Sequence, residues 1–246
     1  MNPGWIEPDW PAPTGIRAVS TLRCGGISQG HYASLNLATH VGDENTRVTE
    51  NRCRLIEALS LPSEPVWLNQ VHGNGVIRIG HPVSPDPVPT ADAAFTGERG
   101  VVCAVLTADC LPVLLCSRDG TNIAAVHAGW RGLASGVIEA TVNRMERKPG
   151  LAWLGPALGQ QAFEVGNEVR DVFLQRDACH ADCFMPGLSE GKWLGDLYGL
   201  ARRILQGLGI TAVYGGEYCT ASEPDRFFSW RRDHTTGRMA TLIWRQ

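Results

Sequence analysis

Three short, almost purely apolar runs dominate the middle of the chain. They cover residues 101–106, 113–116 and 122–126, and such runs are typical of strands that are buried on both faces. An Asp119-Gly120 turn signal lies between the second and the third run, and it favours a tight connection. The sequence therefore predicts three buried strands, of which the last two are joined by a tight turn.

The rest of the chain alternates between helical spacing and short apolar runs. Apolar residues at helical spacing predict helices at 48–59 (with Asn45 or Thr46 as the cap), 133–145, 165–174 and 197–208. Short runs predict strands at 18–22, 66–68, 152–154, 212–214 and 239–244, and the proline-rich segment 81–89 is predicted to be a loop. Because no repeat or linker separates these elements, we expect one mixed α/β domain over residues 1–246.

Composition narrows the class of protein. The chain is 43% hydrophobic and 19% charged, with a formal net charge of -3, which is typical of a globular protein with a substantial core. We expect no nucleic-acid partner, because there is no basic excess, and no membrane span, because no apolar run is long enough. The N-terminal residues lack the basic and apolar regions of a secretory signal, so we expect a cytoplasmic protein.

The eight cysteines are expected to be reduced in that compartment. Five of them are interpreted as small apolar side chains: Cys24, Cys53, Cys103, Cys116 and Cys219. Cys179, His180 and Cys183 have a spacing that could suit a metal, but no second pair of ligands lies nearby in the sequence, so their role stays open.

Three segments place a metal-ligating side chain at the end of an apolar run. They are Leu68-Asn69-Gln70-Val71-His72-Gly73, Thr107-Ala108-Asp109-Cys110-Leu111-Pro112 and Ala125-Val126-His127-Ala128-Gly129-Trp130-Arg131-Gly132. Together they offer two imidazoles and one thiolate, and no obvious fourth ligand. Three protein ligands with one open position are typical of a catalytic zinc.

Strand pairing predicts that two of these ligands meet. If the three central strands run up, down and up, Cys110 and His127 return to the same end. The approach of His72 cannot be predicted in this way. Gly129 permits close backbone approach next to His127, and Arg131 at the start of a helix is typical of an anion site.

The three segments together resemble the family known as polyphenol oxidase or laccase-domain proteins, whose members are described as purine nucleoside phosphorylases with adenosine deaminase activity. Residues 21–28 and 34–37 are similar to the N-terminal signature of that family, and residues 228–232 and 236–238 are similar to its C-terminal one. The resemblance spans nearly the whole chain, although residues 179–183 match no part of the pattern.

The resemblance implies both a fold and a metal site. It implies an α+β domain built as a four-layer α-β-β-α sandwich with mixed sheets, related to the cysteine-dependent catalytic domain of a bacterial toxin. It also implies a zinc ion held by His72, Cys110 and His127, and purine nucleosides such as adenosine, inosine and methylthioadenosine as substrates together with phosphate.

Zinc chemistry suggests roles for further residues. A zinc-bound water of lowered pKa can attack an electrophilic ring carbon, as deamination requires. Phosphorolysis needs an anion site, for which Arg23, beside a glycine-rich loop, and Arg131 are the candidates. Asp109 is interpreted as an orienting residue or a general base for the centre at Cys110.

Three alternative functions remain. A multi-copper oxidase is disfavoured because the seven histidines form no His-x-His pair, although copper can bind adventitiously. A thiol- or zinc-dependent amidase that edits peptidoglycan precursors, with Cys110 as the nucleophile in the thiol version, is the second hypothesis. A non-catalytic binding module is the third. The oligomeric state, the preferred nucleoside and the native metal are left open.

Overall fold

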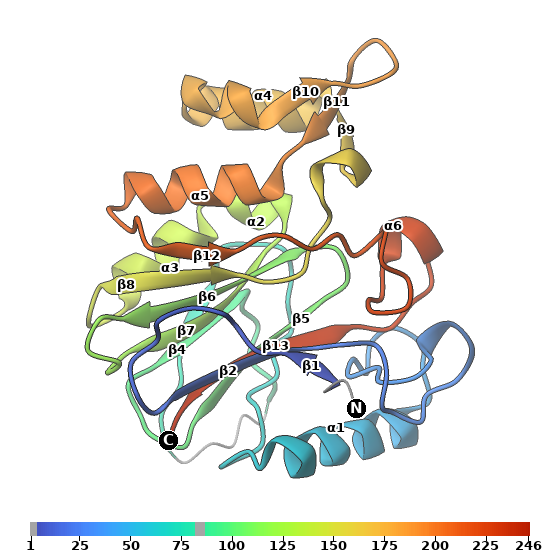
Figure 1. Ribbon diagram of the computed structural model, residues 1–246, viewed down its shortest axis with the longest axis vertical. Coiled ribbons are helices and arrows are strands. Elements are labelled where there is room, and N and C mark those ends of the chain that lie inside the picture. Colours follow the sequence, from blue (N-terminus) through green and yellow to red (C-terminus); the bar gives the residue numbers. More distant parts are fainter. Residues whose placement is uncertain (1–3, 82–86) are drawn as a thin grey trace.

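The structure is a computed structural model that describes residues 4–81 and 87–246. Two β-sheets lie face to face, and helices cover both outer faces (Figure 1). The four-stranded sheet has the order β1-β2-β13-β5 and is antiparallel, whereas the six-stranded sheet has the order β12-β8-β6-β7-β4-β3 and mixes parallel with antiparallel pairs.

The strands of the four-stranded sheet are β1 (Trp5–Ile6), β2 (Ile16–Thr21), β5 (Val102–Thr107) and β13 (Met239–Arg245). Those of the six-stranded sheet are β3 (Val76–Arg78), β4 (Ala93–Thr96), β6 (Leu111–Ser117), β7 (Ile123–Ala128), β8 (Pro149–Leu154) and β12 (Val213–Gly215).

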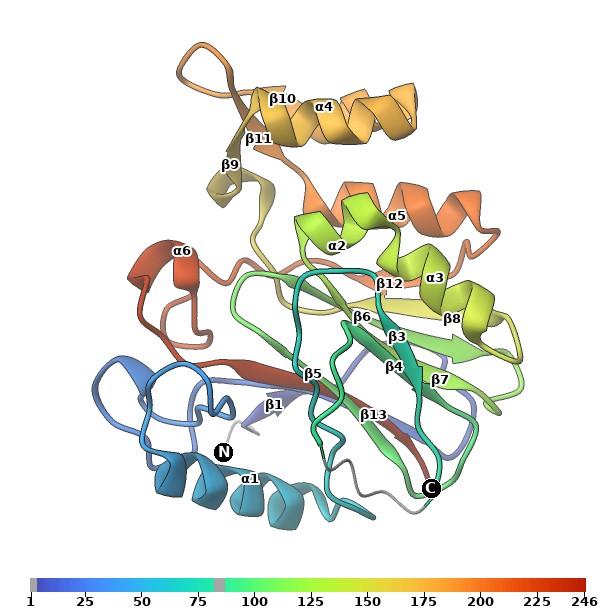
Figure 2. The same ribbon diagram turned by 180° about the vertical axis from the view of Figure 1, so that it is seen from behind.

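Apolar packing divides the core into layers. Helix α1 (Asn45–Leu59) packs against the outer face of the four-stranded sheet. Helices α2 (Trp130–Ser135), α3 (Val137–Arg144) and α5 (Leu197–Gly207) cover the outer face of the six-stranded sheet (Figure 2). A third cluster fills the space between the sheets. The four-layer α-β-β-α order implied by the resemblance is therefore confirmed.

A smaller unit stands on top of helix α5 in Figure 1. It consists of the antiparallel sheet β10-β11-β9 and helix α4. Its elements are β9 (Glu164–Gly166), α4 (Asn167–Arg176), β10 (Phe184–Pro186) and β11 (Lys192–Gly195), with the 3₁₀ segment Ala178–Cys183 after α4. The short helix α6 (Trp230–Asp233) precedes β13.

The β6–β7 hairpin positions the site. Its register pairs Leu111 with Ala128 and Pro112 with His127, so the residue just before β6 lies beside the end of β7. Alternate residues of β7 point to opposite faces: Ala124 and Val126 pack under the helices. The His127 side chain therefore points to the other face of the sheet, toward the four-stranded sheet.

Several details differ from the sequence predictions. Strand β5 does not pair with β6 but belongs to the other sheet, so Cys110 lies in a crossing between sheets. The single helix predicted at 133–145 is two helices, because Gly136 adopts a left-handed conformation with φ 84°. The predicted strand 66–68 is reduced to one bridge from Val66. Five residues of the predicted loop 81–89 lie outside the described residues, and 87–89 form neither helix nor strand.

The short strands β1, β3, β4, β9, β10 and β11 were not predicted, because two to four residues give too little periodicity to recognise. In the described part of the chain, no helix combines the length and the apolar character needed to cross a bilayer.

Candidate functional site

The structure brings His72, Cys110 and His127 together. One ligand atom from each lies within 4.8 Å of the other two, and the two imidazole rings meet edge to face with centroids 4.8 Å apart. His72 comes from an exposed loop, Cys110 from the crossing between the sheets, and His127 from the buried end of β7. Two nitrogens and one sulfur can hold a single metal ion and leave one position open.

A buried carboxylate that the sequence analysis missed organises this group. Asp92 has no exposed side-chain surface, and its Oδ1 accepts a hydrogen bond of 2.8 Å from His127 Nδ1. This bond leaves His127 Nε2 available as the metal ligand. The carboxylate also accepts from the backbone N–H groups of Val71, His72 and Gly73 at 3.3, 2.9 and 2.7 Å. Asp92 therefore positions two of the three candidate ligands.

The electrostatics of Asp92 agree with this role. Burial alone would raise the pKa of its carboxyl, but the hydrogen bonds from His127 and from the Gly73 N–H outweigh burial and lower the pKa. The carboxylate stays ionised next to the imidazole, which is the arrangement of a metal-ligating histidine and its orienting partner.

Close backbone packing sets the position of the Cys110 sulfur. A Cβ atom on Gly129 would lie 2.7 Å from that sulfur, so only glycine fits there. His72 itself has a left-handed backbone with φ 61°, a conformation that costs free energy for a residue with a side chain. The three hydrogen bonds to Asp92 hold the backbone around it in place.

Asp109 positions the other ligand segment. Its backbone is also left-handed, with φ 91°. One carboxylate oxygen accepts from the Thr220 hydroxyl and the other from the Arg231 backbone N–H, both at 2.6 Å. Because both oxygens are engaged, the geometry favours an orienting residue for Cys110 over a general base.

Cys110 and His127 form a charged pair when no metal is bound. Burial raises the pKa of the Cys110 thiol, but the charge and hydrogen bond of His127 dominate and lower it to about 6. Burial likewise lowers the pKa of His127, but the Cys110 thiolate and Asp92 raise it to about 9. The thiolate–imidazolium pair therefore persists between pH values of about 6 and about 9.

The three ligands lie in the wall of a cavity of about 380 Å³, a size typical of small-molecule sites. Its lining includes the aromatic side chains Trp130, Phe163 and Trp230 and the polar side chains His40, Gln70 and Arg238. Of the polar side chains, Arg238 is close enough to Cys110 for the charge of the thiolate to act on its pKa.

Arg238 is a half-buried cation in the cavity lining. One of its guanidinium nitrogens donates to the carbonyls of Thr236 and Gly237, both at 3.0 Å, and no carboxylate of the described residues forms an ion pair with it. Burial lowers the pKa of this group, against the charge of Cys110. A half-buried guanidinium that has no ion-pair partner among the described residues and lines a cavity is suited to bind an anion.

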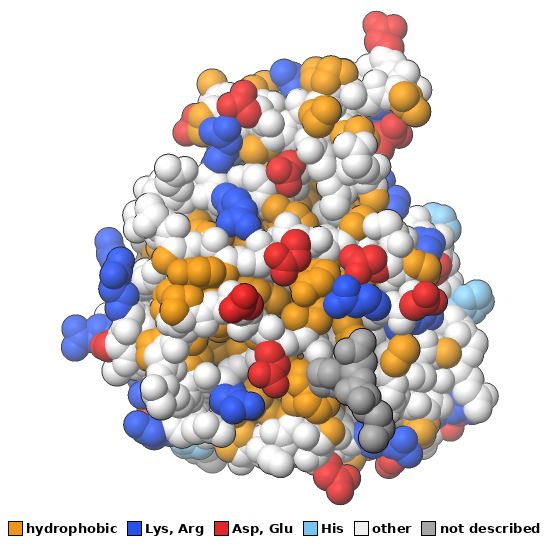
Figure 3. Space-filling model, in the orientation of Figure 1, with side chains coloured by type: hydrophobic (Ala, Val, Ile, Leu, Met, Phe, Trp, Pro, Cys, Tyr) orange, Lys and Arg blue, Asp and Glu red, His pale blue; other side chains and the backbone are white. Residues whose placement is uncertain are grey.

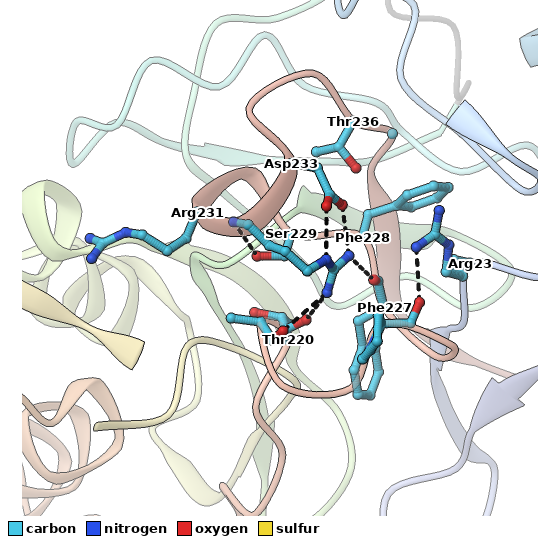
Figure 4. Close-up of polar contacts among 12 residues, drawn as sticks. Arg23, Thr220, Phe227, Phe228, Ser229, Arg231, Asp233 and Thr236 are labelled. Carbon is cyan, nitrogen blue, oxygen red and sulfur yellow. Dashed lines mark hydrogen bonds and ion pairs between the residues drawn. The ribbon is translucent and has the colours of Figure 1, made fainter. Parts of the chain in front are cut away.

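Arg131 lines the same cavity, where its guanidinium lies 4.4 Å from the centre of the Trp130 ring. Arg23 is not among the lining residues. Its guanidinium donates to the carbonyls of Ala33 and Pro224 and connects two surface loops. Figure 4 shows Arg23 beside Phe228, whereas Arg231 points away to the opposite side.

The segment 179–183 is separate from this site. His180 is buried, and its Nδ1 donates to the Phe173 carbonyl at 3.0 Å. Within the described residues the only group of three potential metal ligands is the one at His72. All eight cysteines are free thiols, and Cys103 and Cys116 are fully buried core residues, as predicted.

Asp92, His40 and Arg238 were not found as site residues by sequence reasoning. Asp92 carried one available signal, since an acidic residue directly before the apolar segment Ala93-Ala94-Phe95 is unusual unless a partner satisfies it. Arg238 lies within the C-terminal signature, but nothing in its spacing indicated a position next to Cys110.

Comparison with known proteins finds similarity along almost the whole chain. The family described as "Multi-copper polyphenol oxidoreductase laccase" matches residues 17–246. The purine nucleoside phosphorylase YfiH of Escherichia coli is 51% identical over 97% of this chain and 98% of its own length. A purine nucleoside phosphorylase of Pseudomonas aeruginosa is 50% identical over the full length of both chains.

Solved structures show the same fold. A Neisseria meningitidis protein with 47% identity superposes with a TM-score of 0.92 and covers 99% of both chains. The protein YlmD of Geobacillus stearothermophilus, with 30% identity, superposes with a TM-score of 0.88 over 100% of this chain and 97% of its own.

The charged pair predicts selective modification of Cys110. In metal-free protein, the rate of Cys110 alkylation by iodoacetamide should rise with pH around a midpoint of about 6, because the thiolate is the nucleophile. His127→Ala should move the midpoint upward. Peptide mass spectrometry measures the rates, and Cys179, whose pKa is raised by its hydrogen bond to Asp177, serves as the internal control. A Cys110 midpoint no lower than that of Cys179 would contradict the pairing.

Proposed function

Since the chain belongs to the family described as multi-copper polyphenol oxidoreductase laccases, we propose that it has the activity for which its full-length relatives are named, the phosphorolysis of purine nucleosides. In this reaction a phosphate oxygen bonds to C1′ of the ribose, the bond from C1′ to the purine nitrogen breaks, and the bonding pair leaves with the base. The observation that carries the proposal is one cavity lined by three potential metal ligands, by a half-buried arginine without an ion-pair partner among the described residues, and by three aromatic side chains.

Arg238 is the proposed primary phosphate ligand. Its guanidinium is half-buried, lacks an ion-pair partner among the described residues, and lies in the field of the Cys110 thiolate. A phosphate in the cavity would accept charge-assisted hydrogen bonds from this guanidinium. Water competes less for these hydrogen bonds in the cavity than it does at an exposed surface. Arg131, at the more exposed rim, is proposed as a second phosphate contact.

The aromatic side chains of the cavity are the proposed binding site for the purine ring. Trp130, Phe163 and Trp230 line the cavity, and flat side chains of this kind stack on heteroaromatic rings.

We propose zinc as the metal. The donor set of two imidazoles and one thiolate fits zinc with an open position, and the orienting carboxylate Asp92 fits a catalytic site. When bound, a zinc ion would act as a Lewis acid that stabilises developing negative charge and lowers the pKa of a water, which is what a side reaction of adenosine deamination needs.

The residues give less support to a site for several copper ions, which the family description names. The described part of the chain offers one group of three ligands, which suits a single ion, and copper is proposed only as an adventitious occupant.

We further propose small-molecule substrates, no nucleic-acid partner and a cytoplasmic location. The eight free thiols support a reducing compartment, and the net charge of -3 gives no electrostatic basis for binding nucleic acid.

One observation favours a second candidate. Cys110, His127 and Asp92 follow one another as nucleophile, base and orienting group, which is the arrangement of thiol hydrolases. An amidase acting on peptidoglycan precursors therefore remains the alternative, and it requires no metal in its thiol version.

The first test separates the two functions. Adenosine or inosine with phosphate should yield the free base and ribose 1-phosphate, and omission of phosphate should stop base release. His72→Ala, Cys110→Ala and His127→Ala should each lose zinc and lower kcat/KM by about 10²-fold or more, as chromatography of products and metal analysis will show. Turnover of a cell-wall amide alone, with a rate that chelation leaves unchanged, would establish the thiol amidase instead.

The second test concerns the arginines. Arg131→Lys keeps the charge but loses the two-pronged geometry, so it should raise KM for phosphate by about one order of magnitude with zinc content and Tm nearly unchanged. Arg23→Lys is the matched control: it should lower Tm, because three hydrogen bonds to loop carbonyls are lost, and leave KM for phosphate unaltered. An Arg131→Lys protein that melts early with normal kinetics would make Arg131 structural.

A further inference from the structure

A second hollow lies at the opposite end of the six-stranded sheet. It has a volume of about 400 Å³ and is formed where β6 ends, β8 begins and α5 turns toward β12. Because β6 is seven residues long, this end is about 20 Å from Cys110. We call it the basic hollow, after the three cations that line it, Arg118, Arg147 and Lys148.

The three cations are uncompensated. Within the described residues, the side chains of Arg118, Arg147 and Lys148 take part in no ion pair. Asp119 is the one carboxylate in the lining, and its Oδ1 already accepts from the Ser117 hydroxyl and from the Thr121 N–H and hydroxyl. The nearby Glu146 forms an ion pair with Arg78 at 3.0 Å. The hollow therefore has a positive excess.

The backbone is shaped to place one of these cations. The pairing of β6 with β8 shifts register between Cys116 and Ser117, and a β-bulge of this kind re-aims the residues after it. Arg118 then lies across Gly150: a Cβ atom at that position would be 2.2 Å from Arg118 Cγ. The Arg118 side chain can take this position beside the hollow because residue 150 is a glycine and has no side chain that would clash with it.

The hollow is also lined by four apolar side chains, Val142, Pro149, Leu208 and Ile210, which we call its apolar floor. Figure 3 shows basic side chains along the margin where β8 begins in Figure 1. Cations around an apolar floor complement a molecule that combines an anionic group with a flat apolar part.

We propose that the basic hollow is a second ligand site, which binds a small phosphate ester with an apolar ring. The phosphate group pairs with Arg118, Arg147 and Lys148, and the ring covers the apolar floor. This site is independent of the metal-ligating cavity, and it does not depend on the function proposed for that cavity.

The test uses phenyl phosphate as the probe on the full-length protein. Amide signals of Gly150 and Gly209, which line the hollow, report binding at this site in an NMR titration, and inorganic phosphate is titrated for comparison. Phenyl phosphate should shift both signals and bind more tightly than inorganic phosphate. Arg147→Ala with Lys148→Ala should weaken its binding at least about tenfold, because two charge-assisted contacts are lost.

The control pair Arg54→Ala with Lys192→Ala removes the same charge from exposed positions on α1 and β11 and should leave the binding within about twofold, since exposed distant charges are screened. Arg238→Ala should also leave it unchanged. Equal weakening in both pairs would reduce the effect to general electrostatic attraction and overturn the proposal. Unshifted glycine signals, equal affinity for both probes, or dependence on Arg238 would overturn it as well.

Discussion

The Asp92 carboxylate is the interaction on which the candidate site depends. Asp92 directly precedes β4 of the six-stranded sheet and is fully buried. Its carboxylate accepts four hydrogen bonds, one from His127 and three from the backbone of residues 71–73. A buried carboxylate must have its lone pairs satisfied, so the loop around His72 and the imidazole of His127 are fixed by the same requirement. The two candidate histidine ligands therefore lie close together because both segments donate hydrogen bonds to the same buried carboxylate.

A second aspartate, Asp109, positions the segment that carries the third candidate ligand, Cys110. Asp109 joins the segment before Cys110 to Thr220 and to the start of α6, so the C-terminal signature is tied to the thiol. The polar part of the site is thus built from distant parts of the chain, and the same cavity is lined by Trp130, Phe163 and Trp230. Such a lining fits a substrate with a charged and an aromatic part.

The sequence predicted what local patterns control. The central strands, helices α1 and α5, and the meeting of Cys110 with His127 follow from apolar runs and one tight turn. The approach of His72 did not, since it depends on hydrogen bonds to a residue twenty positions away. Arg238 joined the site because β13, at the C-terminal end, pairs with β5 in the middle of the chain, a contact that no spacing in the sequence reveals. Arg23 looked like an anion ligand beside a glycine-rich loop, but loop carbonyls take up its donors.

The most direct measurement is the zinc affinity of Asp92→Asn. The amide turns one acceptor into a donor that faces backbone N–H groups or the imidazole, so the orientation of both histidines is lost. Competition with a chelator should show a zinc affinity lowered by about 10- to 100-fold. Asp43→Asn is the control, because its carboxylate holds Ser28 and Asn36 in another loop, and it should bind zinc as the unaltered protein does. Unchanged zinc affinity in a folded Asp92→Asn protein would contradict the account.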